Sequence, residues 1–114
     1  DIVSASISVL ENPKGIGEVI NFGTNYETSI GDLSVLISEL MGKKIEIYTD
    51  EIRLRPENSE VERLLCDSSK AKQMFNWEPR YKGLSGLKKG LNKTIKWFSN
   101  KKNLSLYKSN IYNI

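Results

Sequence analysis

The sequence of 114 residues, of which 39% are hydrophobic and 27% are charged, suits one compact domain and excludes a two-domain enzyme. No apolar run approaches the ~20 residues that span a bilayer, and residues 1–15 lack the features of a signal peptide, so we expect a cytoplasmic protein without a membrane partner. One cysteine, no histidine and a net charge of +3 exclude an intrachain disulfide, histidine-based catalysis, a histidine-ligated zinc site and a nucleic-acid-binding surface.

Two elements are predicted in the first part of the chain. Apolar residues recur near helical spacing in residues 1–12, which predicts a helix that Pro13 ends. Residues 18–22, EVINF, form a short run with little polar alternation, and Gly23 closes it. This pattern predicts a largely buried strand.

A second helix and a second strand follow. Ser29 precedes Asp32 by three positions, a capping-box pattern, and apolar residues then recur at helical spacing up to Gly42. These features predict a helix over residues 30–41. Residues 43–49 alternate isoleucine with polar side chains and predict a short strand with one wet face. Because one helix joins the two strands, we predict a parallel pair with a right-handed crossover, and hence an α/β fold.

The last part of the chain is predicted to be mainly helical. Asp67 and the serines after it can cap a short helix over residues 70–75, which ends at the turn NWEP. Residues 83–98 carry one apolar stripe and a lysine-rich opposite face, which predicts a longer helix. Beyond it no period is visible, so we predict a domain over residues 1–98 and a polar, disordered tail over residues 99–114.

Two further features have a structural and a functional interpretation. Trp77 precedes a Glu-Pro pair after a short helix, and it is more simply a packing anchor than a surface for ligand stacking. The lysines of residues 83–98 are more simply a solvated face than a membrane-binding one, because the run is short and lacks an aromatic-rich surface. We therefore favour the structural interpretation for both features.

The candidate site lies in the charged segment LRPENSEVERLLCD, residues 54–67. Pro56 holds Arg55 in an extended conformation, so that its guanidinium can be presented to phosphate oxygens. Glu60 could accept the hydroxyl groups of a ribose, and Arg63 could add a second phosphate contact. On charge pattern alone, the simpler interpretation is that these side chains pair with one another at the surface, which would stabilise the fold little.

Four segments in consistent order carry a resemblance to a known family. They are GEVINFG, YETSIGDL, RLRPENSEVERLLCDSSKAKQMFNWEP and GLKKGLNKTIKWF, and the likeness covers residues 1–98. This part of the chain resembles the C-terminal third of the extended short-chain dehydrogenase/reductases that act on nucleotide sugars. Within that family it is most similar to the NAD-dependent 4,6-dehydratases, including the UDP-N-acetylglucosamine type of legionaminic acid pathways.

The resemblance implies a nucleotide-diphosphate sugar as the substrate and a separate Rossmann domain as the site of NAD. It places Arg55 on the diphosphate and Glu60 on the nucleotide ribose, with Arg63 as a neighbouring substrate-binding residue. No catalytic, cofactor-binding or metal-binding residue is carried over, because the chain has neither a glycine-rich nucleotide loop nor a Tyr-x-x-x-Lys pair. We expect the full-length enzyme to be a homodimer and this fragment alone to be inactive.

The sequence therefore predicts the small C-terminal substrate-binding domain of an NAD-dependent nucleotide-sugar 4,6-dehydratase or epimerase. Its expected fold is α/β, with short parallel strands, about three to four helices and no Rossmann domain. The residues present do not decide between dehydratase and epimerase, or which sugar and base are bound. The alternative is a freestanding non-catalytic module that binds anions or a partner protein through its lysine-rich helix and tail.

Overall fold

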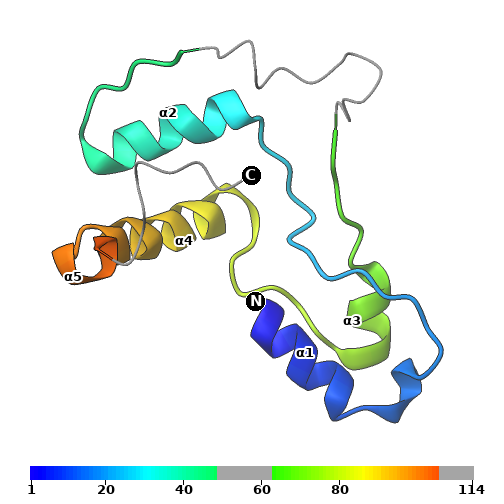
Figure 1. Ribbon diagram of the computed structural model, residues 1–114. Helices are drawn as coiled ribbons and strands as arrows, with labels where there is room; N and C mark the ends of the chain where they lie inside the picture. Colours follow the sequence, from blue (N-terminus) through cyan, green and yellow to red (C-terminus); the bar gives the residue numbers. More distant parts are fainter. Residues whose placement is uncertain (49–62, 106–114) are drawn as a thin grey trace.

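The computed structural model describes residues 1–48 and 63–105, and the regular secondary structure of this part of the chain is helical (Figure 1). The elements are α1 (Ile2–Leu10), η1 (Pro13–Gly15), α2 (Ile30–Met41), α3 (Ser69–Phe75), α4 (Gly83–Phe98) and α5 (Lys101–Leu104). Helices α2 and α4 pack against each other, and α1 and α3 meet in a separate cluster. Within the described ranges, no helix has the length and apolar character needed to cross a membrane.

The helix predicted over residues 1–12 is confirmed as α1. Ala5 is buried on its inner face, whereas Val3 and Leu10 are largely exposed, so the helix offers only a narrow stripe to the interior. Pro13 then begins η1, because its fixed φ suits the first position of a helix. Proline has no backbone N–H, so it could not continue α1, where that donor would be needed.

The helix predicted over residues 30–41 is confirmed as α2, with the caps that its sequence indicates. The Ser29 hydroxyl oxygen accepts a hydrogen bond from the Asp32 backbone N–H at 2.9 Å, and the same hydroxyl donates to the Asp32 carboxylate at 2.7 Å. Gly42 ends the helix at φ 62°, a left-handed conformation that is cheap for glycine. Local capping therefore fixes both ends of α2.

The two helices predicted over residues 70–75 and 83–98 are confirmed as α3 and α4. The Asp67 carboxylate accepts from the backbone N–H of Ser69 at 2.9 Å at the start of α3. Asn76 ends α3 at φ 52°, a conformation that asparagine tolerates better than most residues. The NWEP turn then carries the chain to α4.

The two predicted strands, residues 18–22 and 43–49, are absent from the described part of the chain, so the predicted parallel sheet is not found there. The last residue of the second strand lies outside the described ranges. A strand needs a neighbour to satisfy its backbone groups, and the first segment has no such neighbour in residues 1–48 and 63–105. Ile20 and Phe22 pack inward but are only partly buried, and Val19 is exposed, so the run is less buried than predicted.

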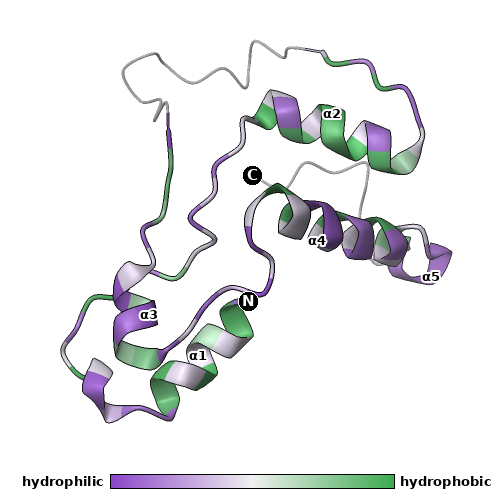
Figure 2. Cartoon of the chain, turned by 180° about the vertical axis from the view of Figure 1, so that it is seen from behind, coloured by the Kyte–Doolittle hydropathy of each residue, from purple (hydrophilic) through white to green (hydrophobic). Residues whose placement is uncertain are grey.

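The main hydrophobic cluster lies between α1, α3 and the segment that precedes α2. It contains buried Ala5, Ala71 and Trp77, with Ile20, Phe22 and Phe75 partly buried around them. The Phe22 ring meets Trp77 edge to face at 5.0 Å between centroids and stacks on Phe75 at 6.1 Å. Figure 2 shows hydrophobic residues along α1, many of them outside this cluster, and hydrophilic residues along much of α4 and α5.

The segment predicted to be a disordered tail begins with an ordered turn. Helix α5 follows α4 directly, and the Asn103 side-chain amide donates to the backbone oxygen of Trp97 at 2.9 Å. Residues 106–114 of the predicted tail lie outside the described ranges.

The side chains of α2, α4 and α5 line an apolar hollow of about 510 Å³ between these helices.

Candidate functional site

Only one of the three predicted substrate-binding residues lies in the described part of the chain. Arg55 and Glu60 fall outside it, whereas Arg63 stands at the start of the segment 63–68 that leads into α3. The Arg63 guanidinium binds both carboxylate oxygens of Glu27, with 3.3 Å between Arg63 Nε and Glu27 Oε2. The structure therefore brings Arg63 to a residue that lies 36 positions earlier, which local sequence patterns did not indicate.

The Arg63 to Glu27 pair is an exposed ion pair. The Arg63 side chain is 75% accessible, and hydrogen bonding to Glu27 raises the pKa of the guanidinium further. A pair this accessible stabilises the fold little, because water competes for both groups. The pair leaves the Arg63 side chain in contact with solvent, with its charge balanced by Glu27.

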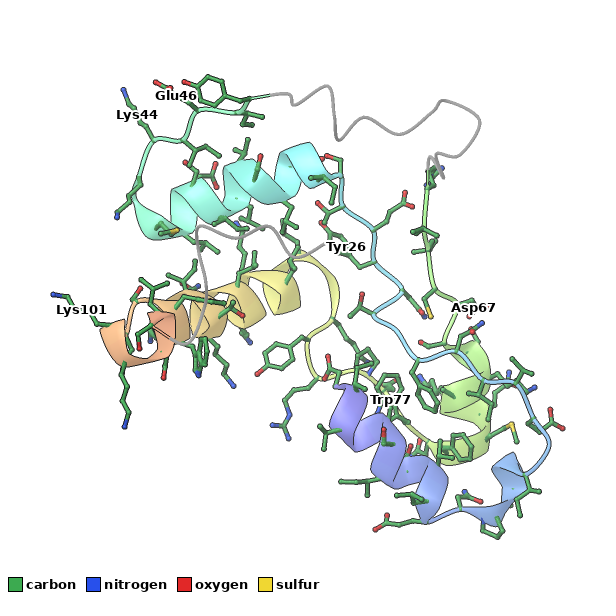
Figure 3. All side chains as sticks on the ribbon, viewed as in Figure 1. Tyr26, Lys44, Glu46, Asp67, Trp77 and Lys101 are labelled. Atoms are coloured by element: carbon green, nitrogen blue, oxygen red, sulfur yellow. The ribbon has the colours of Figure 1, made fainter. Side chains whose placement is uncertain are left out.

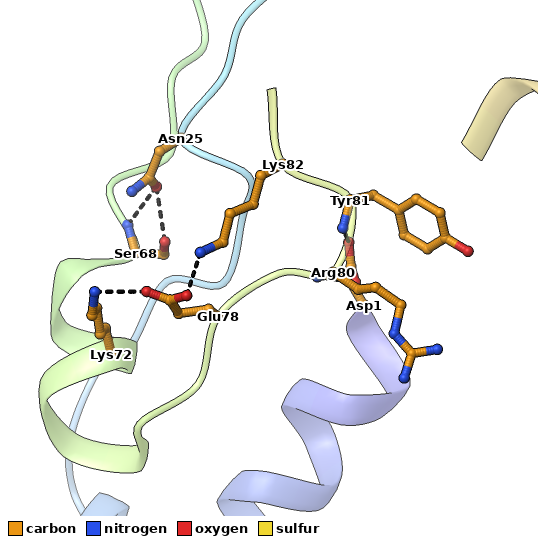
Figure 4. Close-up of polar contacts among 8 residues, drawn as sticks. All are labelled: Asp1, Asn25, Ser68, Lys72, Glu78, Arg80, Tyr81 and Lys82. Carbon is orange, nitrogen blue, oxygen red and sulfur yellow. Dashed lines mark hydrogen bonds and ion pairs between the residues drawn. The ribbon is translucent and has the colours of Figure 1, made fainter. Parts of the chain in front are cut away.

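A pair of hydrogen bonds between the exposed Asn25 and the buried Ser68 holds segment 63–68 beside residues 22–28. The Asn25 side-chain oxygen accepts from both the backbone N–H and the hydroxyl of Ser68, at 2.9 and 2.8 Å (Figure 4). Ser68 is only 5% exposed, so both of its donors need this partner. Sequence reasoning missed the pair, since no local pattern links positions 43 residues apart.

Gly23 brings the same two segments into close approach. A Cβ at Gly23 would lie 2.6 Å from the Cβ and Sγ of Cys66, which is closer than such atoms pack. Only glycine allows this approach without displacing a neighbour. Cys66 itself is half-buried beside this backbone.

An ion cluster joins α3 to the turn before α4. Lys72 Nζ lies 2.6 Å from Glu78 Oε1, and Lys82 binds the other carboxylate oxygen (Figure 4). Hydrogen bonds from Lys72 and Lys82, with the charges of both, lower the pKa of Glu78 to about 2. The cluster borders a shallow polar hollow of about 320 Å³ that Asn25 and Ser68 also line.

Replacing Glu78 by glutamine is expected to remove a pH-dependent part of the stability. Because folding lowers the Glu78 pKa from 4.5 to about 2, the ionised form stabilises the fold above pH 4.5, and this stabilisation is lost as the pH falls toward 2. Urea unfolding should show Glu78→Gln less stable than the parent at pH 6, with the difference gone near pH 2. Glu11→Gln, at a carboxylate without an ion pair among the described residues, is the control. A pH-independent difference would contradict this account.

Trp77 is confirmed as a packing anchor. It is 6% exposed, and its indole N–H donates to the Ser4 hydroxyl at 3.0 Å (Figure 3). The Asp1 carboxylate accepts from the backbone N–H groups of Arg80 and Tyr81 at 2.8 and 3.3 Å, which ties the following turn to the start of α1. These contacts order the turn between α3 and α4. No cluster of candidate metal ligands is present in residues 1–48 and 63–105.

Comparison with curated proteins places the chain beside nucleotide-sugar enzymes. It is 32% identical over 100 residues to the uncharacterized UDP-glucose epimerase YtcB of Bacillus subtilis, a match that covers 87% of this chain and 29% of that protein. It is 33% identical over 110 residues to the UDP-glucuronate 4-epimerase of Thermodesulfobacterium geofontis, covering 96% of this chain and 30% of that protein. The dTDP-D-glucose 4,6-dehydratase of Homo sapiens is 32% identical over 103 residues, covering 86% and 27%.

By their names, these relatives are epimerases and a dehydratase of nucleotide sugars. This class of enzyme agrees with the resemblance described in the sequence analysis. The chain spans less than a third of their length. The matched regions cover 86–96% of this chain. No protein-family model and no solved structure matches the chain.

Proposed function

We propose that this chain is the substrate-binding part of an NAD-dependent nucleotide-sugar 4,6-dehydratase or epimerase of the extended short-chain dehydrogenase/reductase family. The observation that carries the proposal is the match to named epimerases and a named dehydratase over 86–96% of the chain. A short motif can recur by chance on unrelated folds, but a match along nearly the whole chain is a stronger warrant. The substrate is a nucleotide-diphosphate sugar.

The proposed substrate contacts come from the charged segment. Arg55 binds the diphosphate through its planar fork of N–H donors, and Glu60 accepts hydroxyl groups of the nucleotide ribose. Arg63 is proposed as a further substrate-binding residue, whose accessible guanidinium would exchange Glu27 for a phosphate oxygen. The Asn25 to Ser68 bonds and the close approach at Gly23 support it further, because they hold the end of this segment against the fold.

The proposed enzyme has a Rossmann domain, which binds NAD. It is also proposed to be a homodimer. The chain fits no NAD itself, since it has no glycine-rich nucleotide loop and no Tyr-x-x-x-Lys pair, and it is proposed to be inactive alone. Exposed apolar side chains support the presence of a further domain. Ile2, Leu10, Ile16 and Val19 are 68–85% exposed around α1, and a patch of this kind is typical of a surface that other protein covers.

The finer proposal is a UDP-N-acetylglucosamine 4,6-dehydratase of the legionaminic acid type. The test is to incubate the enzyme, with its Rossmann domain and NAD, separately with UDP-N-acetylglucosamine and UDP-glucose and to identify products by NMR. A 4-keto-6-deoxy product from the first substrate supports this proposal, and a 4-epimer supports the epimerase. Conversion of neither sugar nucleotide, with no binding of either, would favour the non-catalytic module instead.

A further inference from the structure

The charges of this chain are divided unevenly along the sequence. Residues 79–105 hold eight of its 17 lysines and arginines and none of its 14 aspartates and glutamates, so the rest of the chain has a net charge of −5. A modest overall charge of +3 therefore conceals one strongly basic segment. This segment comprises α4, α5 and the turn before them.

Part of the segment folds into a hollow of about 520 Å³, here called the basic pocket. It is lined by Arg80, Tyr81, Lys89, Asn92, Lys93 and Lys96. The three lysines lie four and then three positions apart on α4, so they share one face of the helix. The side chains of Arg80 and Tyr81 extend from the turn on the side away from Glu78 (Figure 4).

The cations of the basic pocket have no carboxylate to neutralise them among the described residues. Lys93 Nζ donates to the Tyr81 hydroxyl at 2.5 Å, and the Asp1 carboxylate contacts only backbone N–H groups of the turn. The hydrogen bond from Lys93, and then the charges of Lys93, Arg80 and Lys89, lower the pKa of the Tyr81 phenol. Like charges one turn apart on a helix repel each other, so an anion bound here would relieve that repulsion.

We propose that the basic pocket binds a small, multiply phosphorylated anion. The Arg80 guanidinium suits two phosphate oxygens at once, and lysine ammonium groups act as point charges for the remaining oxygens. The Asn92 amide can donate a further hydrogen bond at the rim. The inference does not depend on the proposed enzymatic function.

The test is isothermal titration of the full chain with inorganic tripolyphosphate at physiological ionic strength. Lys89→Gln/Lys93→Gln should weaken binding by about tenfold or more, because it removes two charge-assisted contacts. The matched control, Lys88→Gln/Lys102→Gln, removes the same charge outside the pocket and should retain the parent affinity. Equal losses in the two variants, or no binding by the parent chain, would overturn the proposal.

Two further measurements locate the anion and its source. Bound tripolyphosphate should raise the pKa of Tyr81, since a nearby anion disfavours phenolate, and the shift in phenolate absorbance should be lost in Tyr81→Phe. Cosedimentation with vesicles of phosphatidylcholine and phosphatidylserine tests a membrane surface instead. Vesicle binding without tripolyphosphate binding, or binding that leaves the Tyr81 titration unchanged, would contradict a pocket for a small anion.

Discussion

Replacing Trp77 by alanine is expected to destabilise the chain by about 3–5 kcal/mol, the range found when a large aromatic side chain is deleted from a core. Trp77 touches the Phe22 ring edge to face, and its indole N–H is bonded to Ser4. It thereby joins α1, the segment before α2 and the turn after α3. Few other large side chains are buried among the described residues, so little remains to compensate for its loss.

The change is measured by urea unfolding followed by circular dichroism, because the substitution removes a fluorophore. Trp97→Ala is the matched control, at a tryptophan that is 43% exposed, and it should lower the free energy of unfolding clearly less. The loss for Trp77→Phe should lie between those of Trp97→Ala and Trp77→Ala, since phenylalanine keeps an aromatic ring but loses the hydrogen bond to Ser4. Similar losses for Trp77→Ala and Trp97→Ala would mean that the α1 and α3 cluster is not the main core.

Replacing Gly86 by alanine is expected to lower the free energy of unfolding by about 1–3 kcal/mol, the range for overpacking a well-filled site. Gly86 is buried in α4, where a Cβ would lie 2.7 Å from the backbone Cα and O of Tyr81. Backbone atoms cannot rotate away as a flexible side chain can, so the turn and the helix would have to separate. The loss should appear as a lower urea midpoint.

Gly90→Ala is the matched control for this prediction, one turn along the same helix. A Cβ there would lie 3.9 Å from the Tyr81 ring, an ordinary contact, and alanine favours helix over glycine by about 1 kcal/mol. The two substitutions should therefore change stability in opposite directions. A stabilised Gly86→Ala would show that α4 does not approach the Tyr81 backbone as described.

The sequence predicted the helices well because their signals are local. The Ser29 cap, the Gly42 stop and the apolar stripe of residues 83–98 all lie within the element that they define. The strand over residues 18–22 failed because a strand depends on a neighbour that its own residues do not specify. Ile20 and Phe22 still pack against the core whereas Val19 is exposed, so the predicted burial of this run holds only in part.

The substrate-binding roles of the candidate site residues stay predictions, and only the surroundings of Arg63 are described. Arg63 was chosen for its charge, and its partner Glu27 was not, because ion pairs between distant segments leave no local pattern. The same holds for Asn25 and Ser68. For Arg55 and Glu60, which lie outside the described residues, the roles on diphosphate and ribose stay predictions drawn from the resemblance.

The most direct test of the central proposal is the affinity of the enzyme for UDP, measured by isothermal titration with and without Arg55. Arg55→Ala should raise the Kd about 10- to 100-fold, because a charge-assisted contact to the diphosphate contributes about 1.5–3 kcal/mol. Arg53→Ala removes the same charge two positions away and serves as the control. A Kd for Arg55→Ala equal to those of the parent and of Arg53→Ala would contradict the proposed substrate-binding role of this chain.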